Sequence, residues 1–262
     1  MLFHALAIIA GVIASFVTAL FLISLIVKRN DIADSAWGMG ILLVVLTSWY
    51  LHSGESVLMD VLLLLVTLWG IRLSLRIFLR NMRKEEDYRY RKWRDEWGKW
   101  FFIRSYFQVY LLQGFLMIVV GYTGIHASVY ARDASIGVLA ILGILIWGVG
   151  YFFEVVGDWQ LDRFINSKPP QGAILKDGLW KYSRHPNYFG EVSMWWGIWL
   201  VVSGLPMSYL ALVSPLMITF LILKVSGIPM LEKRFEGNPD FEEYKQKTSA
   251  FFPLPQRKTD SL

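Results

Sequence analysis

Long apolar stretches alternate with short polar segments along almost the whole chain. An apolar stretch crosses a bilayer as a helix when it has about 20 residues, and shorter stretches suffice when they tilt or pack inside a bundle. The pattern therefore predicts an all-α membrane protein, a bundle of seven transmembrane helices. The expected ranges are residues 5–27, 36–51, 57–79, 109–125, 136–157, 192–204 and 207–225.

Composition supports a membrane protein, because 55% of the residues are hydrophobic and 16% are aromatic, more than soluble domains of this size usually contain. The absence of cysteine excludes disulfides, thiolate metal sites and cysteine nucleophiles. The first apolar stretch has no basic leader and is too long for the core of a cleavable signal peptide, so we expect a membrane helix. With no internal repeat evident, we expect residues 1–262 to form one domain in the lipid bilayer.

Basic residues gather in alternate loops, which orients a membrane protein because Lys and Arg are retained on the cytoplasmic side. Lys28 and Arg29 follow the first apolar stretch, and two further basic segments occupy residues 80–104 and 168–184. The other loops, which alternate with these basic segments, are nearly uncharged. We therefore expect the amino terminus outside and the carboxyl terminus in the cytoplasm, as in a bacterial inner membrane. The net charge of +5 then reflects topology, and no nucleic-acid partner is expected.

The basic segment at residues 80–104 mixes Trp and Tyr with charged residues. This mixture suits a helix that lies in the headgroup region with its rings at the interface. Some of its cations, including Arg83, could instead reach a phosphate group. The polar tail after Arg234 is expected to be a cytoplasmic extension.

Ionisable residues inside apolar stretches are costly, so they usually face a polar cavity or a ligand. Arg72 and Arg76 lie one turn apart, as do Glu154 and Asp158. Two carboxylates on one helical face repel each other in a low dielectric, so the acidic pair requires a cation or a polar ligand. A structural ion-pair network is the alternative for both pairs. Asp34, which precedes the second stretch, suits either a site residue or a helix cap.

The strongest local signal is the sequence GLWKYSRHPNYFGE at residues 178–191. Pro186 interrupts the helical pattern just before an apolar helix, and a helix amino terminus carries partial positive charge. We therefore expect an anion to bind here. The polar side chains around the proline are Lys181, Arg184, His185, Asn187, Tyr188 and Glu191.

Several common site motifs are missing from the sequence. No GxGxxG fingerprint follows a strand and no GxxxxGK[ST] loop occurs, so a soluble type of nucleotide domain is not expected. The four histidines are scattered without an HxxxH pair, so no metal is expected. A cofactor would have to bind among the helices.

The segment at residues 178–191 is preceded by EVVGDWQLDRF at 154–164 and followed by KVSGIPMLEKRF at 224–235. In this order the three segments resemble the steroid 5α-reductase superfamily. A DxxWG element, matched by Asp34 and Trp37, is similar to its bacterial branch. The resemblance implies a seven-helix reductase that uses NADPH to reduce the carbon–carbon double bond of a 4-ene-3-oxo steroid or a similar membrane-soluble enone.

The resemblance also implies site residues for the cofactor and the ketone. The eukaryotic steroid enzymes of the superfamily hold the ketone with a glutamate and a tyrosine; Asp34 falls near the glutamate, and Trp69 is the nearest match to the tyrosine. A protonated Asp34, or the indole N–H of Trp37 or Trp69, could donate a hydrogen bond to the ketone. The residues implied for NADPH are Asp158, Arg184, His185, Asn187, Tyr188 and Glu191, with Lys168, Lys224 and Arg83 as looser candidates for its phosphates.

Two other functions remain open. An RHPxYxGE type of element also occurs in isoprenylcysteine carboxyl methyltransferases, where it helps to bind S-adenosylmethionine. The seven-helix count, the DxxWG match and the shared face of Glu154 and Asp158 favour the reductase. A transporter or lipid-binding protein could also explain buried charge, but no pair of broken helices occurs in matching halves of the sequence.

Overall fold

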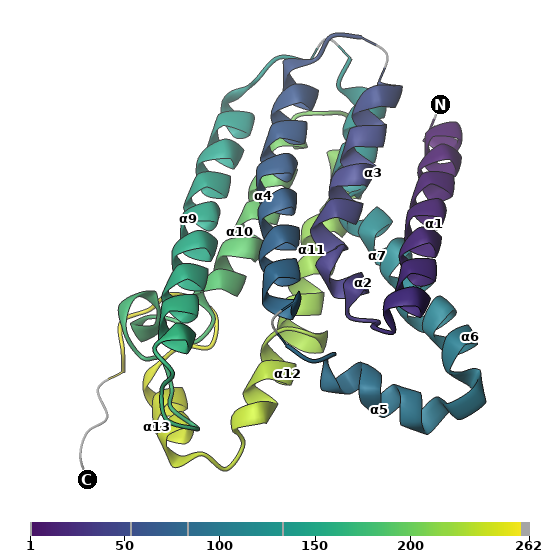
Figure 1. Ribbon diagram of the computed structural model, residues 1–262. Coiled ribbons are helices and arrows are strands. Elements are labelled where there is room, and N and C mark those ends of the chain that lie inside the picture. Colours follow the sequence, from purple (N-terminus) through teal and green to yellow (C-terminus); the bar gives the residue numbers. More distant parts are fainter. Residues whose placement is uncertain (1, 53, 83, 133, 258–262) are drawn as a thin grey trace. The chain divides into compact units, whose positions relative to one another are not determined.

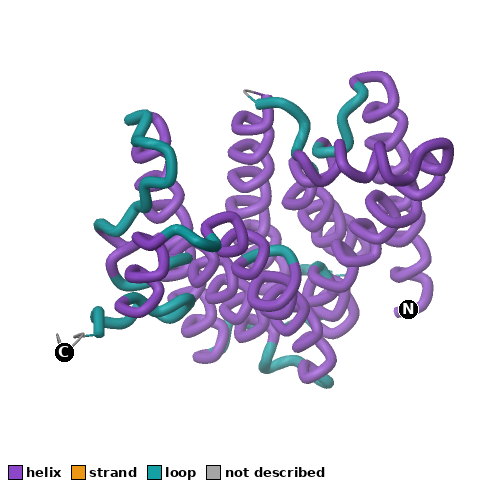
Figure 2. The backbone as a smooth tube through the Cα atoms, turned by 90° about the horizontal axis from the view of Figure 1, so that it is seen from below, coloured by secondary structure: helices purple, strands orange, loops and turns teal. Residues whose placement is uncertain are grey.

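The computed structural model describes residues 2–52, 54–82, 84–132 and 134–257, and in this part of the chain all regular elements are helical (Figures 1 and 2). The predicted all-α fold is therefore confirmed. Arg83 lies outside the described residues. The chain divides into two compact units, one of Met1–Gly137 with Val201–Ser214 and one of Val138–Leu200 with Pro215–Leu262. The prediction of a single domain remains a prediction.

The first unit is built around α1, α3 and α4, and Figure 1 shows α5 running crosswise to them. Its α-helices are α1 (Leu2–Val27), α2 (Ile32–Ser35), α3 (Trp37–Leu51), α4 (Val57–Met82), α5 (Tyr88–Trp97), α6 (Phe101–Ser105), α7 (Leu112–Val120) and α8 (Tyr122–Tyr130). Its other helical segments are η1 (Gly98–Trp100), η2 (Tyr106–Leu111) and η4 (Ser208–Leu212).

Helices α3 and α4 approach each other closely because glycines face each other. A Cβ atom added to Gly38 would lie only 2.5 Å from the carbonyl oxygen of Gly70. The Met39 N–H also donates a hydrogen bond to Ser74 Oγ at 2.9 Å. Small residues let helix backbones meet in a membrane, where van der Waals packing and hydrogen bonds drive association. The contact fixes the two helices that carry Trp37 and Trp69.

The second unit is carried mainly by a long helix, α9, and by α10. Its complete elements are α9 (Val138–Asn166), η3 (Gly178–Lys181), η5 (Leu221–Val225), α12 (Ile228–Glu232), η6 (Lys233–Phe235) and α13 (Pro239–Lys247). It also holds most of α10 (Pro186–Val202) and of α11 (Val213–Phe220). Two pairs of glycines bring α9 and α10 into backbone contact. A Cβ atom added to Gly190 would lie 2.4 Å from the carbonyl oxygen of Gly150. A Cβ atom added to Gly197 would lie 2.6 Å from the carbonyl oxygen of Gly143.

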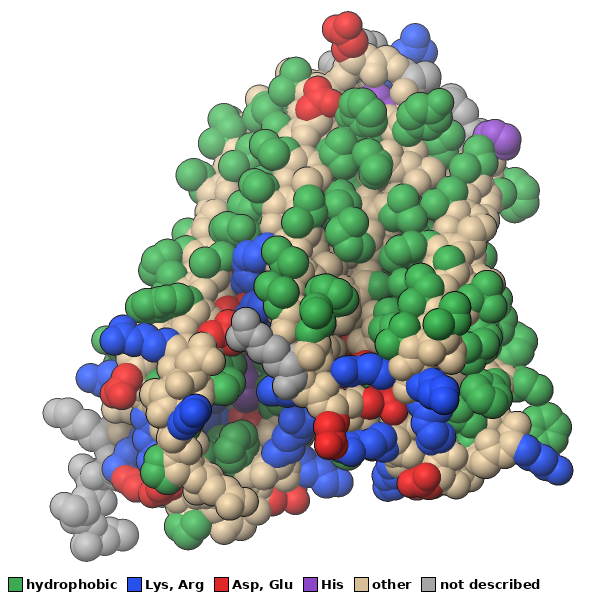
Figure 3. All heavy atoms as spheres, viewed as in Figure 1, with side chains coloured by type: hydrophobic (Ala, Val, Ile, Leu, Met, Phe, Trp, Pro, Cys, Tyr) green, Lys and Arg blue, Asp and Glu red, His purple; other side chains and the backbone are tan. Residues whose placement is uncertain are grey.

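Within the described residues, five helical stretches are long and apolar enough to cross a membrane, as expected of a multi-pass integral membrane protein. They are Leu2–Val27, Val57–Met82, Tyr88–Val120, Val138–Asn166 and Ser208–Phe235, with Trp37–Leu51 as a shorter apolar helix. In the first unit, hydrophobic side chains cover α3 and α4 while charged side chains gather near α5 (Figure 3). The count of seven spans and the orientation of the termini remain predictions.

Several predicted boundaries differ from the structure, and the seventh stretch, for example, ends at Phe235 rather than at residue 225. The fourth helical stretch begins at Tyr88 rather than at residue 109, because the basic segment is itself helical. The fifth helix continues to Asn166 rather than ending at residue 157. The sixth begins at Pro186 rather than at residue 192, because a proline at the first helical position needs no N–H partner and has a suitable fixed φ.

Candidate functional site

Asp34 is the centre of a hydrogen-bonded cluster in the first unit. Its Oδ2 atom accepts a hydrogen bond from Arg89 Nη2 at 2.8 Å. Its Oδ1 atom accepts from the Tyr90 hydroxyl at 2.9 Å and from Gln113 Nε2 at 3.3 Å. Helix α3 has no side-chain cap at its amino end, so Asp34 is not the cap that the sequence allowed. Helices α2, α5 and α7 instead converge on one carboxyl group.

The surroundings of Asp34 shift its pKa in two opposite directions. Burial raises the pKa of Asp34, while the positive charge of Arg89 and the hydrogen bond from Tyr90 act in the opposite direction. The Asp34 side chain is 28% exposed and that of Arg89 is 25% exposed. Arg89 binds two carboxylates, since its Nε also donates to Asp87 at 2.9 Å. Asp34 therefore takes up a proton more readily than a solvated aspartate does.

Tyr90 is a member of this cluster that the sequence did not reveal. Its side chain is only 2% exposed, although it lies in the segment interpreted as an interfacial helix. The sequence offered only a tyrosine among charged residues, with no sign that it would reach Asp34. The predicted aromatic donors lie on two other helices: Trp37 is half-buried at the start of α3, and Trp69 on α4 is 1% exposed.

The turn between α1 and α2 is tied to the segment that follows α4. Arg29 forms a two-pronged ion pair with Asp31, with Nη2 at 2.7 Å from Oδ2, and also donates to the Asn81 carbonyl at 3.0 Å. The Asn30 N–H donates to Glu86 Oε1 at 2.8 Å. These contacts hold the short helix α2, and hence Asp34, in place.

In the second unit, the predicted cations Arg184 and His185 share one carboxylate. Arg184 Nε donates to Glu232 Oε1 at 2.8 Å, and His185 Nε2 lies 3.1 Å from the same oxygen. Arg184 Nη1 also donates to the carbonyl oxygens of Lys245 at 3.2 Å and Thr248 at 2.5 Å. Arg184 is 8% exposed, so it links the start of α10 to α12 and to the end of α13.

His185 is held as part of a packed surface rather than as a solvated loop residue. Burial lowers its pKa from the usual value of 6.5, although Glu232 acts in the opposite direction. A neutral imidazole that faces a carboxylate donates through Nε2–H. The ring stacks on Tyr188 with centroids 5.6 Å apart. Two of the residues implied for the cofactor, His185 and Tyr188, thus lie side by side.

Asp158 and Asn187 meet where α9 faces the start of α10. Asn187 Nδ2 donates to Asp158 Oδ1 at 3.0 Å. Glu154, Asp158 and Glu191 are all buried in this unit. Asn187 Oδ1 is buried and accepts no hydrogen bond from the described residues. Such an acceptor fits a ligand that carries an N–H or O–H donor.

The looser phosphate candidates stand apart from this arrangement. Lys168 is exposed and has a left-handed backbone with φ of 52°, and Lys224 is exposed in η5. Within the described ranges, no hydrogen bond or ion pair involves either ammonium group. Arg83 cannot be placed, since it lies outside the described residues. Across residues 2–257, apart from the gaps already given, no cluster of three or more His, Asp or Glu could hold a metal.

The tail after Arg234 packs against the segment around Arg184, which the sequence did not predict. A parallel bridge pairs Ser183 with Ser249, and the Arg184 N–H donates to the Ser249 carbonyl at 2.8 Å. The Tyr244 hydroxyl donates to the Trp180 carbonyl, and the Leu254 N–H donates to the Tyr182 carbonyl at 2.9 Å. The tail therefore packs against, and hydrogen-bonds to, the segment that carries Arg184 and His185.

A family profile described as "Protein of unknown function (DUF1295)" matches residues 20–248 of this chain. An uncharacterized protein of the fission yeast Schizosaccharomyces pombe is 21% identical over 282 residues, covering 94% of this chain and 79% of the yeast protein. No solved structure matches the chain. The matched residues contain both the Asp34 cluster and the Arg184 cluster.

Proposed function

Because the chain belongs to the DUF1295 family, which is steroid 5α-reductase-like, we propose that it is a membrane oxidoreductase that uses NADPH to reduce the double bond of an enone. The substrate class is a 4-ene-3-oxo steroid or a similar apolar enone. One observation carries the proposal: the Tyr90 hydroxyl lies 2.9 Å from the carboxyl of Asp34. A carboxyl group and a tyrosine are the pair that holds the ketone in the superfamily that this sequence resembles.

The Asp34 and Tyr90 pair suits the polarisation of a ketone. When hydride reaches the β-carbon of an enone, negative charge develops on the carbonyl oxygen. A fixed hydrogen-bond donor at that oxygen stabilises the transition state by about 3 kcal/mol. The Tyr90 hydroxyl can rotate from Asp34 to the ketone, and Asp34 can donate when it is protonated. Arg89 and Gln113 keep the carboxyl in place.

NADPH, when bound, supplies the hydride. The buried acceptor Asn187 Oδ1 fits an amide or hydroxyl donor of a dinucleotide, and Asp158 orients its amide group. Arg184 stabilises the backbone at the start of α10 through its hydrogen bonds. The proposed cofactor residues are Asp158, Arg184, His185, Asn187, Tyr188 and Glu191, with Lys168, Lys224 and Arg83 toward the phosphates.

The proposed arrangement in the cell follows from the chemistry of the two ligands. A charged dinucleotide enters from the cytoplasm, where the basic loops are expected, whereas an apolar enone enters from the bilayer. This requires the predicted orientation, with the amino terminus outside, in a bundle of seven spans. A bacterial inner membrane is the expected location.

The direct test supplies purified protein in detergent with NADPH and a 4-ene-3-oxo steroid. We expect loss of the near-ultraviolet absorbance of NADPH and a product heavier by two hydrogen atoms. A matched reaction contains S-adenosylmethionine and a prenylated cysteine. Methyl transfer in that reaction, or no NADPH oxidation with a panel of apolar enones, would contradict the proposal.

The cofactor residues are tested separately by calorimetry with NADPH. Asn187→Leu removes the buried acceptor at nearly the same size, so NADPH affinity should fall by about tenfold or more, the equivalent of one lost hydrogen bond to a polar ligand. Gln171→Leu, at an exposed loop position, is the control. Equal affinity in the two variants would remove Asn187 from the cofactor site.

A further inference from the structure

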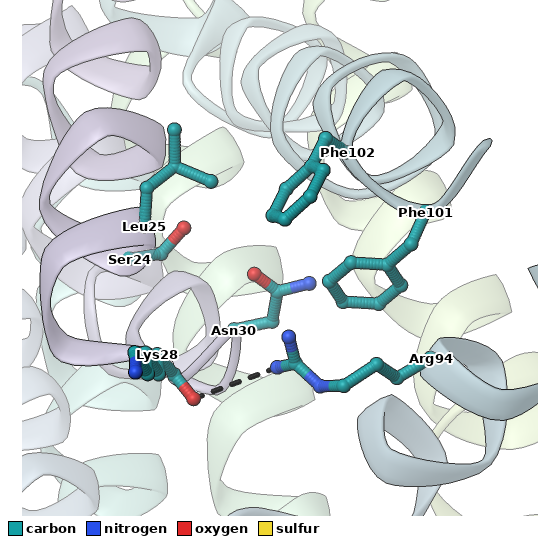
Figure 4. A pocket seen from close by; sticks show the side chains of 7 residues that line it. All are labelled: Ser24, Leu25, Lys28, Asn30, Arg94, Phe101 and Phe102. Carbon is teal, nitrogen blue, oxygen red and sulfur yellow. Dashed lines mark hydrogen bonds between the residues drawn. The ribbon is translucent and has the colours of Figure 1, made fainter. Parts of the chain in front are cut away.

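A small pocket opens in the first unit where α1 ends, and none of the described residues of the proposed reaction lines it (Figure 4). Its volume is about 250 Å³. Its walls come from the last turn of α1, the turn that follows it, α5 and α6. Since α1 is apolar enough to cross a membrane and ends at Val27, the pocket lies next to the polar end of a membrane span.

One side of the pocket carries two basic residues, Arg94 from α5 and Lys28 from the turn directly after α1. Arg94 Nη2 donates to Glu86 at 3.2 Å and to the Lys28 carbonyl at 3.5 Å. Among the described residues, all side-chain hydrogen bonds of Arg94 use Nη2, and in Figure 4 the other terminal nitrogen points into the pocket. The guanidinium carbon lies 4.3 Å from the centre of the Phe101 ring, so its orientation is held by a cation–π contact.

The other side of the pocket is apolar and open to the surroundings of the helices. Leu25 on α1 is 37% exposed and Phe102 on α6 is 55% exposed. In the part of the chain that the structure describes, no carboxylate lines the pocket, and Glu86 contacts Arg94 from outside the lining residues. A basic side and an exposed apolar side therefore meet at the end of a membrane span, the arrangement that an anionic amphiphile requires.

We propose that this pocket binds the anionic headgroup of a membrane amphiphile. Arg94 and Lys28 hold the phosphate or carboxylate, and the acyl chain runs along Leu25 and Phe102. The volume is below the range of about 300–1,000 Å³ that encloses a whole drug-sized ligand, so the headgroup is enclosed and the chain stays outside. Membrane lipid and a free phosphate compound share this chemistry, and the experiment separates them.

The test is native mass spectrometry of the detergent-solubilised protein with three probes: phosphatidylglycerol, phosphatidylcholine and soluble glycerol phosphate. We expect phosphatidylglycerol to bind at least tenfold more tightly than either of the others. Arg94→Gln should lower its binding at least fivefold. Arg91→Gln is the matched control, because Arg91 lies on the same helix, is 54% exposed and pairs with Glu85.

A second variant tests the site without disturbing the contact between Arg94 and Glu86. Lys28 has a left-handed backbone with φ of 57°, which Asn adopts readily, so Lys28→Asn removes the charge without backbone strain. It should lower phosphatidylglycerol binding severalfold at an unchanged melting temperature. Equal binding of the two lipids, equal effects of Arg91→Gln and Arg94→Gln, or unchanged binding in Lys28→Asn would overturn the proposal. Glycerol phosphate that binds as tightly as the lipid would overturn a lipid site.

Discussion

The guanidinium of Arg184 donates to Glu232 Oε1 at 2.8 Å, and this ion pair joins the start of α10 to the end of α12. Arg184 is 8% exposed and Glu232 15%, so the pair is shielded from water. His185 reaches the same carboxylate oxygen. Glu232 therefore holds Arg184 and His185, two of the residues proposed for the cofactor, against the end of α12.

Glu232→Gln should destabilise the protein because it leaves the buried charge of Arg184 without a carboxylate. Removing one partner of a buried ion pair costs about 3–5 kcal/mol, and Gln retains one acceptor, so we expect a loss of about 2 kcal/mol. The melting temperature in detergent measures it. Glu236→Gln, at an exposed position four residues on, is the control. Identical melting temperatures would show that the pair contributes nothing.

The burial of His185 predicts a pH-dependent stability. Because its folded pKa lies below its ordinary value of 6.5, the unfolded chain binds the proton at higher pH than the folded protein does. This contribution to stability is therefore present above the ordinary pKa and is lost as the pH falls through it. Between about pH 8 and about pH 5.5, the melting temperature of the wild type should fall relative to that of His185→Gln. A constant difference between the two proteins would mean that His185 does not titrate differently on folding.

Tyr90→Phe should separate the chemistry at Asp34 from stability. The aromatic ring is retained while one hydrogen bond is lost, so the free energy of unfolding should fall by only about 1 kcal/mol. If the hydroxyl polarises the ketone, turnover of a 4-ene-3-oxo steroid should fall by about 10²-fold. Tyr88→Phe, two residues earlier and 51% exposed, should keep full turnover. Full activity in Tyr90→Phe would exclude the phenol from the ketone site.

Gly190→Ala should disrupt the second unit because the added Cβ atom would lie 2.4 Å from the carbonyl oxygen of Gly150. The atom that it meets is backbone, so α9 and α10 must move apart, at a cost of about 1–3 kcal/mol or more. Gly148→Ala is the matched control, since nothing lies within 4 Å of its Cβ position. Ala is favoured over Gly in a helix, so this control should be neutral or stabilising. Equal melting temperatures would argue against the close contact.

The absence of cysteine makes the predicted orientation directly testable. A membrane-impermeant thiol reagent should label Glu55→Cys from outside intact cells, because the loop after α3 is expected to face outward. Lys168→Cys should be labelled only after the membrane is opened. Both positions are exposed on the protein surface, so burial does not explain a difference. The opposite pattern would reverse the topology.

The sequence by itself determined the helical class and most of the apolar helices. The prediction for residues 36–51 agrees with α3 at Trp37–Leu51, because the length and apolarity of a span are local properties. It also located the polar segment around Pro186, although the helix begins at this proline rather than at residue 192. The start of the fourth stretch at Tyr88 lies outside the apolar pattern, because a local cap sets it: the Asp87 side chain accepts a hydrogen bond from the Arg89 N–H.

Only the tertiary structure decided which polar groups meet. Asp34 pairs with Tyr90, 56 positions further along the chain, and Arg184 pairs with Glu232, 48 positions further along. A hydrogen bond requires two atoms within about 3 Å, and that distance depends on how helices reverse and pack. Hydrophobic periodicity specifies which face of a helix is buried, but it does not specify which distant polar side chain lies opposite. Partners at such separations are therefore visible only in the folded chain.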